Sequence, residues 1–165
     1  MNEEISQVVQ ALRAKYPYQF HKSRFGVHIT AGWLPRFVQL CDEVDQVLGE
    51  DKRGFHWDGC DEKFGVANLG FGFHARRQIA IATRALLDPV MTKARLDLKH
   101  RCVVCGQHGD VDPSQSYMLT LCSAHKSERG ESDFWAIVDM GSVYEACNAW
   151  REQKLKEESD RDGQK

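Results

Sequence analysis

Apolar residues recur at helical spacing in two stretches near the start of the chain. Residues 3–15 are predicted to form an amphipathic helix that begins after Asn2, because their apolar side chains fall three or four positions apart. A second helix is predicted from Pro35, which suits a first helical turn, to Gly49, which suits a helix end. One continuous apolar stripe supports it: Phe37, Leu40, Cys41, Val44, Val47 and Leu48.

Pro89 divides the next region of helical composition. Residues 75–87 favour a helix, but proline has no backbone N–H and its ring crowds the preceding turn, so no unbroken helix is expected as far as Lys99. Asp88 as the cap and Pro89 in the first turn instead predict a separate helix. Its apolar face comprises Val90, Met91, Ala94 and Leu98.

Four shorter segments have the composition and alternation typical of strands. They are residues 25–29, 55–57, 69–73 and 117–121. The second and third are expected to be joined through residues 61–65. Gly70 and Gly72 leave one face of the third strand bare, so that a helix or a partner can approach it closely.

The last part of the chain combines one more helix with a charged tail. Ser142 and Glu145 have the spacing of a capping box. Residues 151–165 are predicted to fray into solvent, because almost all of them are polar. The inner face of the last helix comprises Val143, Ala146, Cys147 and Trp150.

Composition indicates a chain with a hydrophobic core of its own. The 165 residues are 42% hydrophobic and 28% charged, close to the globular average, and a chain of this length needs no disulfides to hold a core. No run of about 18 consecutive apolar residues occurs, and the first residues are acidic where a secretory signal is basic. We therefore expect a cytoplasmic protein with no membrane partner. In that reducing compartment, the six cysteines are expected to be metal ligands or buried apolar residues.

Three cysteines and one histidine have the spacing of a metal site. Cys102 and Cys105 form a CxxC pair followed by Gly106, and after an interval of sixteen residues come Cys122 and, three positions on, His125. Two intervening residues let one tight turn aim both thiolates at a single ion. Three thiolates and one imidazole close a tetrahedral shell and favour zinc over harder cations. The sequence therefore predicts one structural Zn²⁺ ion with no open coordination position.

The spacing also predicts the surroundings of this ion. Residues 108–116 are rich in turn-forming residues and leave room for a hairpin, and the second ligand pair stands at a helix start. This order is that of a treble-clef finger, with a zinc ribbon as the nearest alternative. We predict an α+β fold: helices on a small antiparallel sheet over residues 1–99, then a zinc-binding lobe and the C-terminal helix over 100–150, then the tail.

The other cysteines and two further histidines are assigned away from the metal. His100 and His108 are alternative ligands, but each fits a solvent-exposed loop better. Cys41 and Cys147 fall on apolar helix faces, so burial is expected for both. Cys60 has no partner at knuckle spacing and stays without an assigned place.

Five motifs occur in order between residues 16 and 126: Gly32-Trp33-Leu34, Leu40-Cys41, Glu62-Lys63-Phe64-Gly65, Cys102-x-x-Cys105-Gly106 and Leu121-Cys122-x-x-His125. As a set, they resemble those of uncharacterised small zinc proteins of bacteriophages and prophages. Thr30-Ala31 departs from the acidic or glycine-rich approach expected there, and an arginine expected after the third motif is missing. The resemblance implies a phage-related origin and a zinc knuckle, but no activity. By analogy with other small phage proteins, it suggests an inhibitor of host machinery, such as an anti-CRISPR or other anti-defence protein.

The formal net charge of −2 conceals a bipolar chain. Residues 42–62 hold eight acidic and two basic residues, whereas residues 76–101 hold seven basic and two acidic ones. The basic segment is a candidate for nucleic-acid binding, and the acidic one is a candidate mimic of nucleic acid. Both are also typical of ordinary solvated surfaces. The candidate binding residues are Arg76, Arg77, Arg84, Lys93, Arg95, Lys99, Arg101 and Trp135.

Aromatic residues offer a second kind of contact surface. Trp33, Trp57, Phe134, Trp135 and Trp150 are numerous for this length, and tryptophan is enriched at interface hot spots. Each one taken singly fits the core better. Phe134–Trp135 is the pair expected at the surface if one is exposed, because it follows a polar run.

No complete catalytic set is found in the sequence. Asp58, Asp61 and Lys63 resemble a fragment of a restriction-type nuclease site, but such sites take their carboxylates from separate strands. His108 alone does not make a ββα-metal nuclease, which also needs a histidine on the helix. We therefore expect a non-enzymatic, zinc-stabilised protein that binds a host protein or a protein–nucleic-acid complex. Direct nucleic-acid binding and a small metal-dependent nuclease are the alternatives.

Overall fold

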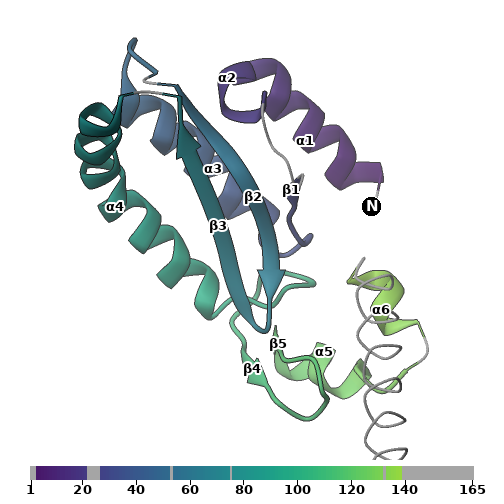
Figure 1. Cartoon of the computed structure of the whole chain (residues 1–165). Coiled ribbons are helices and arrows are strands. Elements are labelled where there is room, and N and C mark those ends of the chain that lie inside the picture. Colours follow the sequence, from purple (N-terminus) through teal and green to yellow (C-terminus); the bar gives the residue numbers. More distant parts are fainter. Residues whose placement is uncertain (1–2, 22–26, 53, 75, 132, 139–165) are drawn as a thin grey trace, which may run out of the picture.

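The computed structural model describes five stretches of the chain and shows an α+β architecture of helices, a three-stranded sheet and a small two-stranded lobe (Figure 1). The described residues are 3–21, 27–52, 54–74, 76–131 and 133–138. The predictions made for Phe25, for the helix after Ser142 with Cys147 and Trp150, and for the tail 151–165 lie outside these stretches.

Helices α1 (Glu3–Lys15) and α3 (Leu34–Leu48) follow the predicted apolar pattern, which confirms both amphipathic predictions. Gly49 ends α3 with a φ of 60°, a conformation that glycine adopts readily. Between α1 and α3 lies the short helix α2, Pro17–Phe20. Its buried Gln19 accepts a hydrogen bond from the Trp57 indole and donates one to the Cys41 carbonyl.

The main sheet is mixed, with the order β1-β2-β3. Strands β2 (Phe55–Lys63) and β3 (Val66–Phe73) are antiparallel, but β1 (Val27–His28) pairs in parallel with β2, so the sheet is not purely antiparallel as expected. Residues 58–63, expected to lead into or form a connection, belong to β2. Strand β2 extends to Lys63 because the turn is confined to Phe64 and Gly65. Their φ values of 53° and 82° are the positive values of a tight two-residue hairpin turn.

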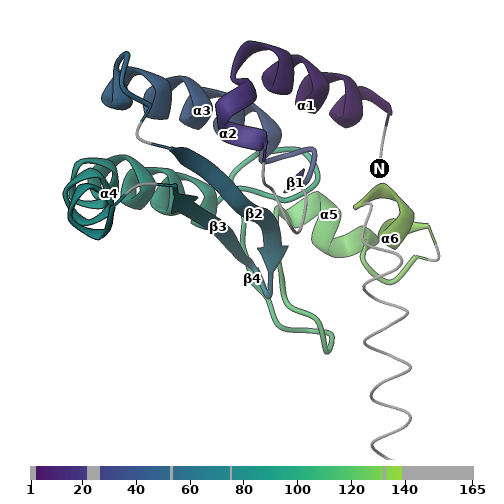
Figure 2. The same cartoon turned by 45° about the horizontal axis from the view of Figure 1, so that its top comes forward.

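The two faces of the hairpin differ sharply in character. The inner face carries large apolar side chains, and Phe37 of α3 packs on Trp57 with ring centroids 5.5 Å apart. Helix α4 lies along β3, and Figures 1 and 2 show α3 and α4 on one side of the hairpin. Gly59 pairs with Gly70 on the other face. The inner pairs are Phe55 with Phe73, Trp57 with Phe71, Cys60 with Leu69 and Glu62 with Ala67.

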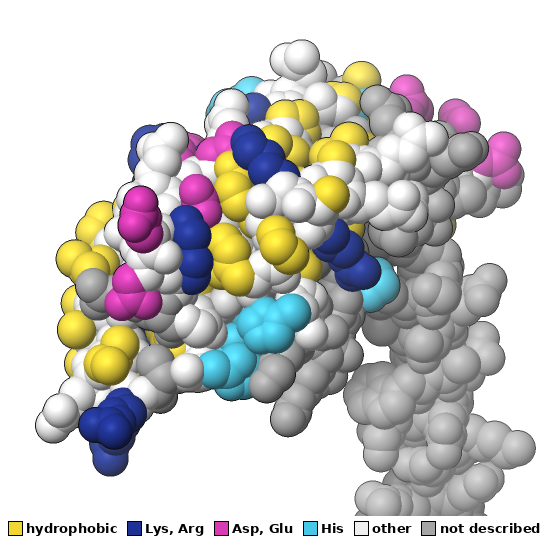
Figure 3. Space-filling view, turned by 90° about the horizontal axis from the view of Figure 1, so that it is seen from above, with side chains coloured by type: hydrophobic (Ala, Val, Ile, Leu, Met, Phe, Trp, Pro, Cys, Tyr) yellow, Lys and Arg dark blue, Asp and Glu magenta, His cyan; other side chains and the backbone are white. Residues whose placement is uncertain are grey.

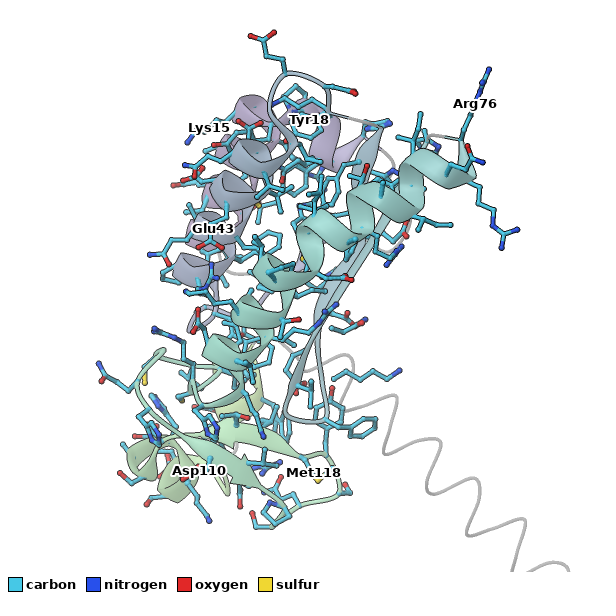
Figure 4. The ribbon with its side chains drawn as sticks, turned by 90° about the vertical axis from the view of Figure 1, so that its left-hand side faces the viewer. Lys15, Tyr18, Glu43, Arg76, Asp110 and Met118 are labelled. Atoms are coloured by element: carbon cyan, nitrogen blue, oxygen red, sulfur yellow. The ribbon has the colours of Figure 1, made fainter. Side chains whose placement is uncertain are left out.

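Helix α4 is one continuous helix from Arg77 to Lys99, so the predicted break at Pro89 is wrong. Pro89 lacks a backbone N–H, so the helix loses one backbone hydrogen bond, and the proline ring is exposed to solvent. In return, the helix keeps one apolar face on α3 and β3 on both sides of the proline, and this burial outweighs the lost bond. The buried residues of this face are Thr83, Leu87, Met91, Ala94 and Leu98. Figure 4 shows α4 as an unbroken ribbon.

The remaining elements form a small lobe at the end of α4. Strands β4 (Asp110–Asp112) and β5 (Leu119–Leu121) make an antiparallel hairpin, followed by the helices α5 (Ser123–Glu128) and α6 (Phe134–Ile137). The predicted strand 117–121 is therefore two residues shorter. Buried side chains of this lobe, such as Val103 and Leu119, join the same hydrophobic cluster as Trp33 and Phe37.

A buried arginine connects α3 to α4. The Arg36 side chain is 4% exposed and donates hydrogen bonds to Asp97 of α4 at 2.8 Å and to Glu43 at 3.0 Å. Two carboxylates thus neutralise one buried guanidinium and hold the two helices in register. None of the helices in the described part of the chain combines the length and the apolarity needed to cross a bilayer.

Replacing Pro89 with alanine should stabilise the protein. Alanine restores the missing backbone donor and removes the ring, and residue 89 is exposed, so no packing is lost. We predict a gain of about 1–3 kcal/mol in the free energy of unfolding, measured by urea denaturation. An unchanged or lower value would contradict this account and show that α4 needs the proline's geometry to follow the sheet.

Candidate metal centre

Four side chains from two parts of the small lobe converge on one point. Cys102, Cys105, Cys122 and His125 each offer a ligand atom, and these atoms all lie within 4.8 Å of one another. Within the described stretches, they are the one such group of three or more histidine, cysteine or acidic side chains. The spacing-based ligand set is therefore brought together by the fold, compatible with one metal ion.

The backbone aims each ligand pair separately. Cys102 and Cys105 flank a tight turn in which Gly106 has a φ of 73° and donates its N–H to the Cys102 carbonyl. Cys122 is the residue that precedes α5, and His125 lies in the first turn of that helix. The backbone N–H of His125 hydrogen-bonds to Cys122 and lowers the pKa of that thiol to about 7. The helix start therefore favours the thiolate that a metal requires.

The distances fit a tetrahedral ion. With bonds of about 2.3 Å to sulfur and 2.05 Å to nitrogen, tetrahedral zinc places two sulfurs about 3.8 Å apart and a sulfur and nitrogen about 3.6 Å apart. The Cys105 and Cys122 sulfurs are 3.8 Å apart. His125 Nδ1 lies 3.4 Å from the Cys102 sulfur and 3.2 Å from that of Cys122. Nδ1 is therefore the ligand atom of His125, and Nε2 faces Glu128 at 3.9 Å.

The segment before α3 packs directly on the metal-binding turn. A Cβ on Gly32 would lie 2.1 Å from the Cys102 carbonyl oxygen and 2.5 Å from the Gly106 nitrogen, so only glycine fits. The Gly32 N–H donates to the Val103 carbonyl at 2.9 Å, and the buried Trp33 indole donates to the Arg101 carbonyl at 2.8 Å. The Gly-Trp motif and the CxxCG motif, 70 residues apart, are thus two halves of one contact.

The tip of the β2–β3 hairpin contacts the same lobe through buried polar groups. Tyr117 donates its hydroxyl proton to Glu62 at 2.7 Å, and the Gly65 N–H donates to the same carboxylate at 2.5 Å. Thr120 of β5 donates to the Gly65 carbonyl at 3.0 Å. Phe64 covers the Tyr117 ring with centroids 4.8 Å apart. The Glu62-Lys63-Phe64-Gly65 motif therefore docks the hairpin on the metal lobe.

A buried ion pair closes the β4–β5 hairpin. Arg129 and Asp112 are 2% and 1% exposed, and their charged groups are 2.5 Å apart. Arg129 also donates to the Tyr117 carbonyl, and Ser114 donates to Asp112 at 2.7 Å. Burial favours the neutral form of Asp112, but the hydrogen bonds from Ser114 and Arg129 outweigh it and lower its pKa to about 2. The sequence analysis missed this pair, because its partners are far apart along the chain and no local spacing marks them.

The remaining cysteines of the described stretches, and the two alternative histidines, do not belong to the ligand group. His100 and His108 are exposed, with rings stacked at a centroid distance of 5.9 Å, and neither belongs to the ligand group. Cys41 and Cys60 are fully buried, and burial raises the pKa of both thiols. Cys60, which had no assigned place, lies on the inner face of β2 opposite Leu69.

The candidate acids of the nuclease alternative, Asp58 and Asp61, belong to no metal-binding group of three or more side chains in the described part of the chain. Glu62 points inward and is buried, whereas Asp61 pairs with Asn68 on the outer face and accepts a hydrogen bond from it at 2.7 Å. Lys63 is exposed at the hairpin tip, and Asp58 sits at a register shift in the strand. Asp58 lies 3.2 Å from His56.

The candidate basic residues occupy different surroundings. Arg84 lies over the Phe71 ring at 4.5 Å, and Arg95 donates to the Leu69 carbonyl, so both lie on the β3 side of α4. Lys93 pairs with Asp97, on the side that faces α3. Arg101 donates to Gly106 within the metal-binding turn. Arg76, Arg77 and Lys99 are exposed, and Figure 4 shows Arg76 pointing away from the molecule.

The candidate aromatic residues are mostly in the core. Trp33 and Trp57 are fully buried and Phe134 is 1% exposed, so three of them serve packing. Trp135 is half-buried, with Tyr117 on one edge and the Arg129 guanidinium 5.7 Å from its ring centre. The expectation of an exposed Phe134–Trp135 pair therefore fails for Phe134.

Searches with the whole chain against protein-family models, curated proteins and solved structures find no match. The resemblance to phage zinc proteins therefore stays a prediction. The description of the site depends on its geometry alone.

The buried Glu62 predicts a specific pH dependence of stability. Burial raises its pKa to about 7 from the ordinary value of 4.5, despite the hydrogen bonds from Tyr117 and Gly65. Between these values the folded state binds more protons than the unfolded state, so Glu62 makes stability fall as pH rises. Relative to Glu62→Gln, the wild-type free energy of unfolding should fall by on the order of 1–3 kcal/mol from about pH 5 to about pH 7.5.

Urea denaturation of both proteins at each pH, with metal present in excess, measures this difference. Protonation of the metal ligands affects both proteins equally and cancels in the comparison. A difference that stays constant across the range would contradict the raised pKa.

Proposed function

We propose that the protein is a non-enzymatic, zinc-stabilised binding protein whose ligand is a nucleic acid or a nucleoprotein complex. The observation that carries the zinc part is the set of four converging ligand atoms at tetrahedral distances. Three thiolates and an imidazole are the ligands of structural zinc. Four protein ligands leave no coordination position for water or substrate, which supports a structural role.

We assign the small lobe to the treble-clef class of zinc fingers. Its order is a CxxC turn, the β4–β5 hairpin and then α5, which carries His125 in its first turn. A zinc ribbon takes its second ligand pair from another hairpin turn instead. The helical position of His125 favours the treble clef.

The proposed nucleic-acid binding depends on the basic side chains along one flank of α4. Arg77, Arg84, Arg95 and Lys99 are separated by 7, 11 and 4 residues, each close to a whole number of helical turns. The contacts of Arg84 with Phe71 and of Arg95 with the Leu69 carbonyl place this flank beside β3. These four residues, here named the basic ridge, extend along about 33 Å of helix. A row of cations of this length suits a polyanion such as nucleic acid.

The acidic segment supports a mimic of nucleic acid less well. Asp42 pairs with Lys15 at 3.0 Å, Asp45 with Lys52 at 2.7 Å, and Glu43 with Arg36, while Glu62 is buried. Half of its eight acids are therefore neutralised or hidden within the protein itself. The phage origin and the anti-CRISPR or other anti-defence role stay hypotheses from the sequence resemblance, and they would take a nucleoprotein complex as the target.

We predict one equivalent of zinc in protein purified without added metal, and its loss in Cys122→Ala. Removal of the ion should cost on the order of 10 kcal/mol of folding free energy in the small lobe. Residues 100–130 should then lose their dispersed amide signals in NMR spectra. His108→Gln is the matched control, because it removes the alternative ligand and should leave the zinc content unchanged. Wild-type protein with well under one equivalent, and a fold insensitive to chelation, would refute the zinc site.

The basic ridge predicts salt-sensitive nucleic-acid binding. Arg77→Ala/Lys99→Ala should lower the affinity for a labelled duplex by about tenfold near 100 mM salt and reduce the salt slope by about 2, because two phosphate contacts are lost. Fluorescence anisotropy over a salt series measures both quantities, with duplex DNA, duplex RNA and single strands compared.

Lys93→Ala is the matched control on the same helix, since Lys93 lies on the opposite flank. Binding that is absent at low salt, independent of salt, or equally weakened by Lys93→Ala would contradict the ridge. Magnesium-dependent cleavage of the labelled strand that Lys63→Ala abolishes would contradict the non-enzymatic part.

A further inference from the structure

Three histidines that take no part in the metal centre gather at the opposite end of the sheet. His21 follows α2, His56 belongs to β2 and His74 follows β3 directly. The rings of His56 and His74 stack with centroids 4.2 Å apart, and the His21 ring lies 5.8 and 5.7 Å from them. Figure 3 shows histidine side chains adjoining one another on this surface.

Backbone carbonyls hold two of these rings in the same tautomer. His21 Nδ1 lies 2.7 Å from the Tyr18 carbonyl oxygen, and His56 Nδ1 lies 3.1 Å from that of Gly54. A carbonyl only accepts, so each Nδ1 carries the proton and, in a neutral ring, each Nε2 keeps a lone pair. Metal-binding histidines are held in this way, with one nitrogen donating to a carbonyl and the other facing the ion.

The Nε2 atom of His56 faces a carboxylate. Asp58 Oδ1 lies 3.2 Å away, at the register shift of β2. Two lone pairs facing each other at this distance repel, so a positive species, either a proton or a metal ion, belongs between them. Oxygen and nitrogen ligands of one ion with bonds of about 2.1 Å lie about 3.0 Å apart in octahedral and about 3.4 Å apart in tetrahedral geometry. The observed distance falls between these values.

The backbone is adapted to this group of side chains. A Cβ on Gly72 would lie 3.0 Å from both Asp58 Oδ2 and His56 Nε2, so the glycine makes room for them. The Gly54 carbonyl accepts the His74 N–H at 2.8 Å as well as the His56 ring. His56 is 6% exposed, whereas His21 and His74 lie at the surface.

We propose that His56, Asp58 and His74, with His21 beside them, form a second metal site for a divalent transition ion of the zinc, nickel or copper class. Imidazole ligands select these ions over magnesium and calcium. The stacked planes of His56 and His74 differ by 7°, and in-plane lone pairs of parallel rings do not meet, so the proposed ion binding requires His74 to turn about its side-chain bonds. Unlike the cysteine-rich centre, this site stays open to solvent.

Nickel titration of the zinc-loaded, full-length protein tests the proposal. The protein is loaded with one equivalent of zinc, which occupies the thiolate site, so calorimetry reports only the additional ion. We expect one equivalent of Ni²⁺ to bind and to broaden the imidazole proton signals of His21, His56 and His74 in NMR spectra. The double variant His56→Gln/Asp58→Asn should weaken this binding at least about tenfold.

The exposed pair His100 and His108 supplies a matched control, because it is another pair of stacked histidine rings and lies outside the proposed site. His100→Gln/His108→Gln should leave the nickel affinity unchanged. Asp58→Asn alone changes one half-exposed side chain and should weaken binding in a protein whose thermal unfolding matches wild type. No uptake at about 100 µM Ni²⁺, or uptake that survives the loss of His56 and Asp58, would overturn the proposal. A proton, and not a metal ion, would then lie between the His56 ring and the Asp58 carboxylate.

Discussion

The convergence of four ligand atoms at the two ends of a 24-residue segment is the constraint on which the small lobe depends. The strands of this lobe are three residues long and bury little by themselves, so an ion held by these four side chains would be its main cross-link. The metal-binding turn then becomes a rigid surface for other segments. Gly32 sits against its backbone with no room for a Cβ, and Trp33 hydrogen-bonds to Arg101. The start of α3 is therefore positioned by the backbone of residues 101–106.

Buried polar groups connect this lobe to the rest of the molecule. Glu62 at the hairpin tip receives the Tyr117 hydroxyl, and Arg129 joins Asp112 to the Tyr117 carbonyl. Each group has partners from another segment, and a misplaced hairpin would leave a buried charge unpaired. Such an error costs several kcal/mol, whereas the correct arrangement contributes little net stability. These contacts serve mainly to define one orientation of the hairpin on the metal lobe.

Local patterns predicted the helices well and the strands less well. The apolar stripes of α1 and α3 repeat every three or four residues, and this period survives in the structure. Pro89 misled the prediction because its cost is local, whereas the burial of Leu87 and Met91 on both sides of it is tertiary. The length of β2 was underestimated because Phe64, a bulky residue with positive φ, carries no turn signal in its sequence.

The sequence by itself determined the amphipathic helices of α1 and α3 and the candidate ligand set at positions 102, 105, 122 and 125, because helical period and knuckle spacing are short-range properties. The tertiary structure decided which side chains meet across long separations. Glu62 and Tyr117 are 55 residues apart, and no local pattern records that they pair. The same holds for His56 with His74 and for Lys15 with Asp42, which are 27 residues apart. Burial and long-range packing, which no local spacing encodes, bring these groups together.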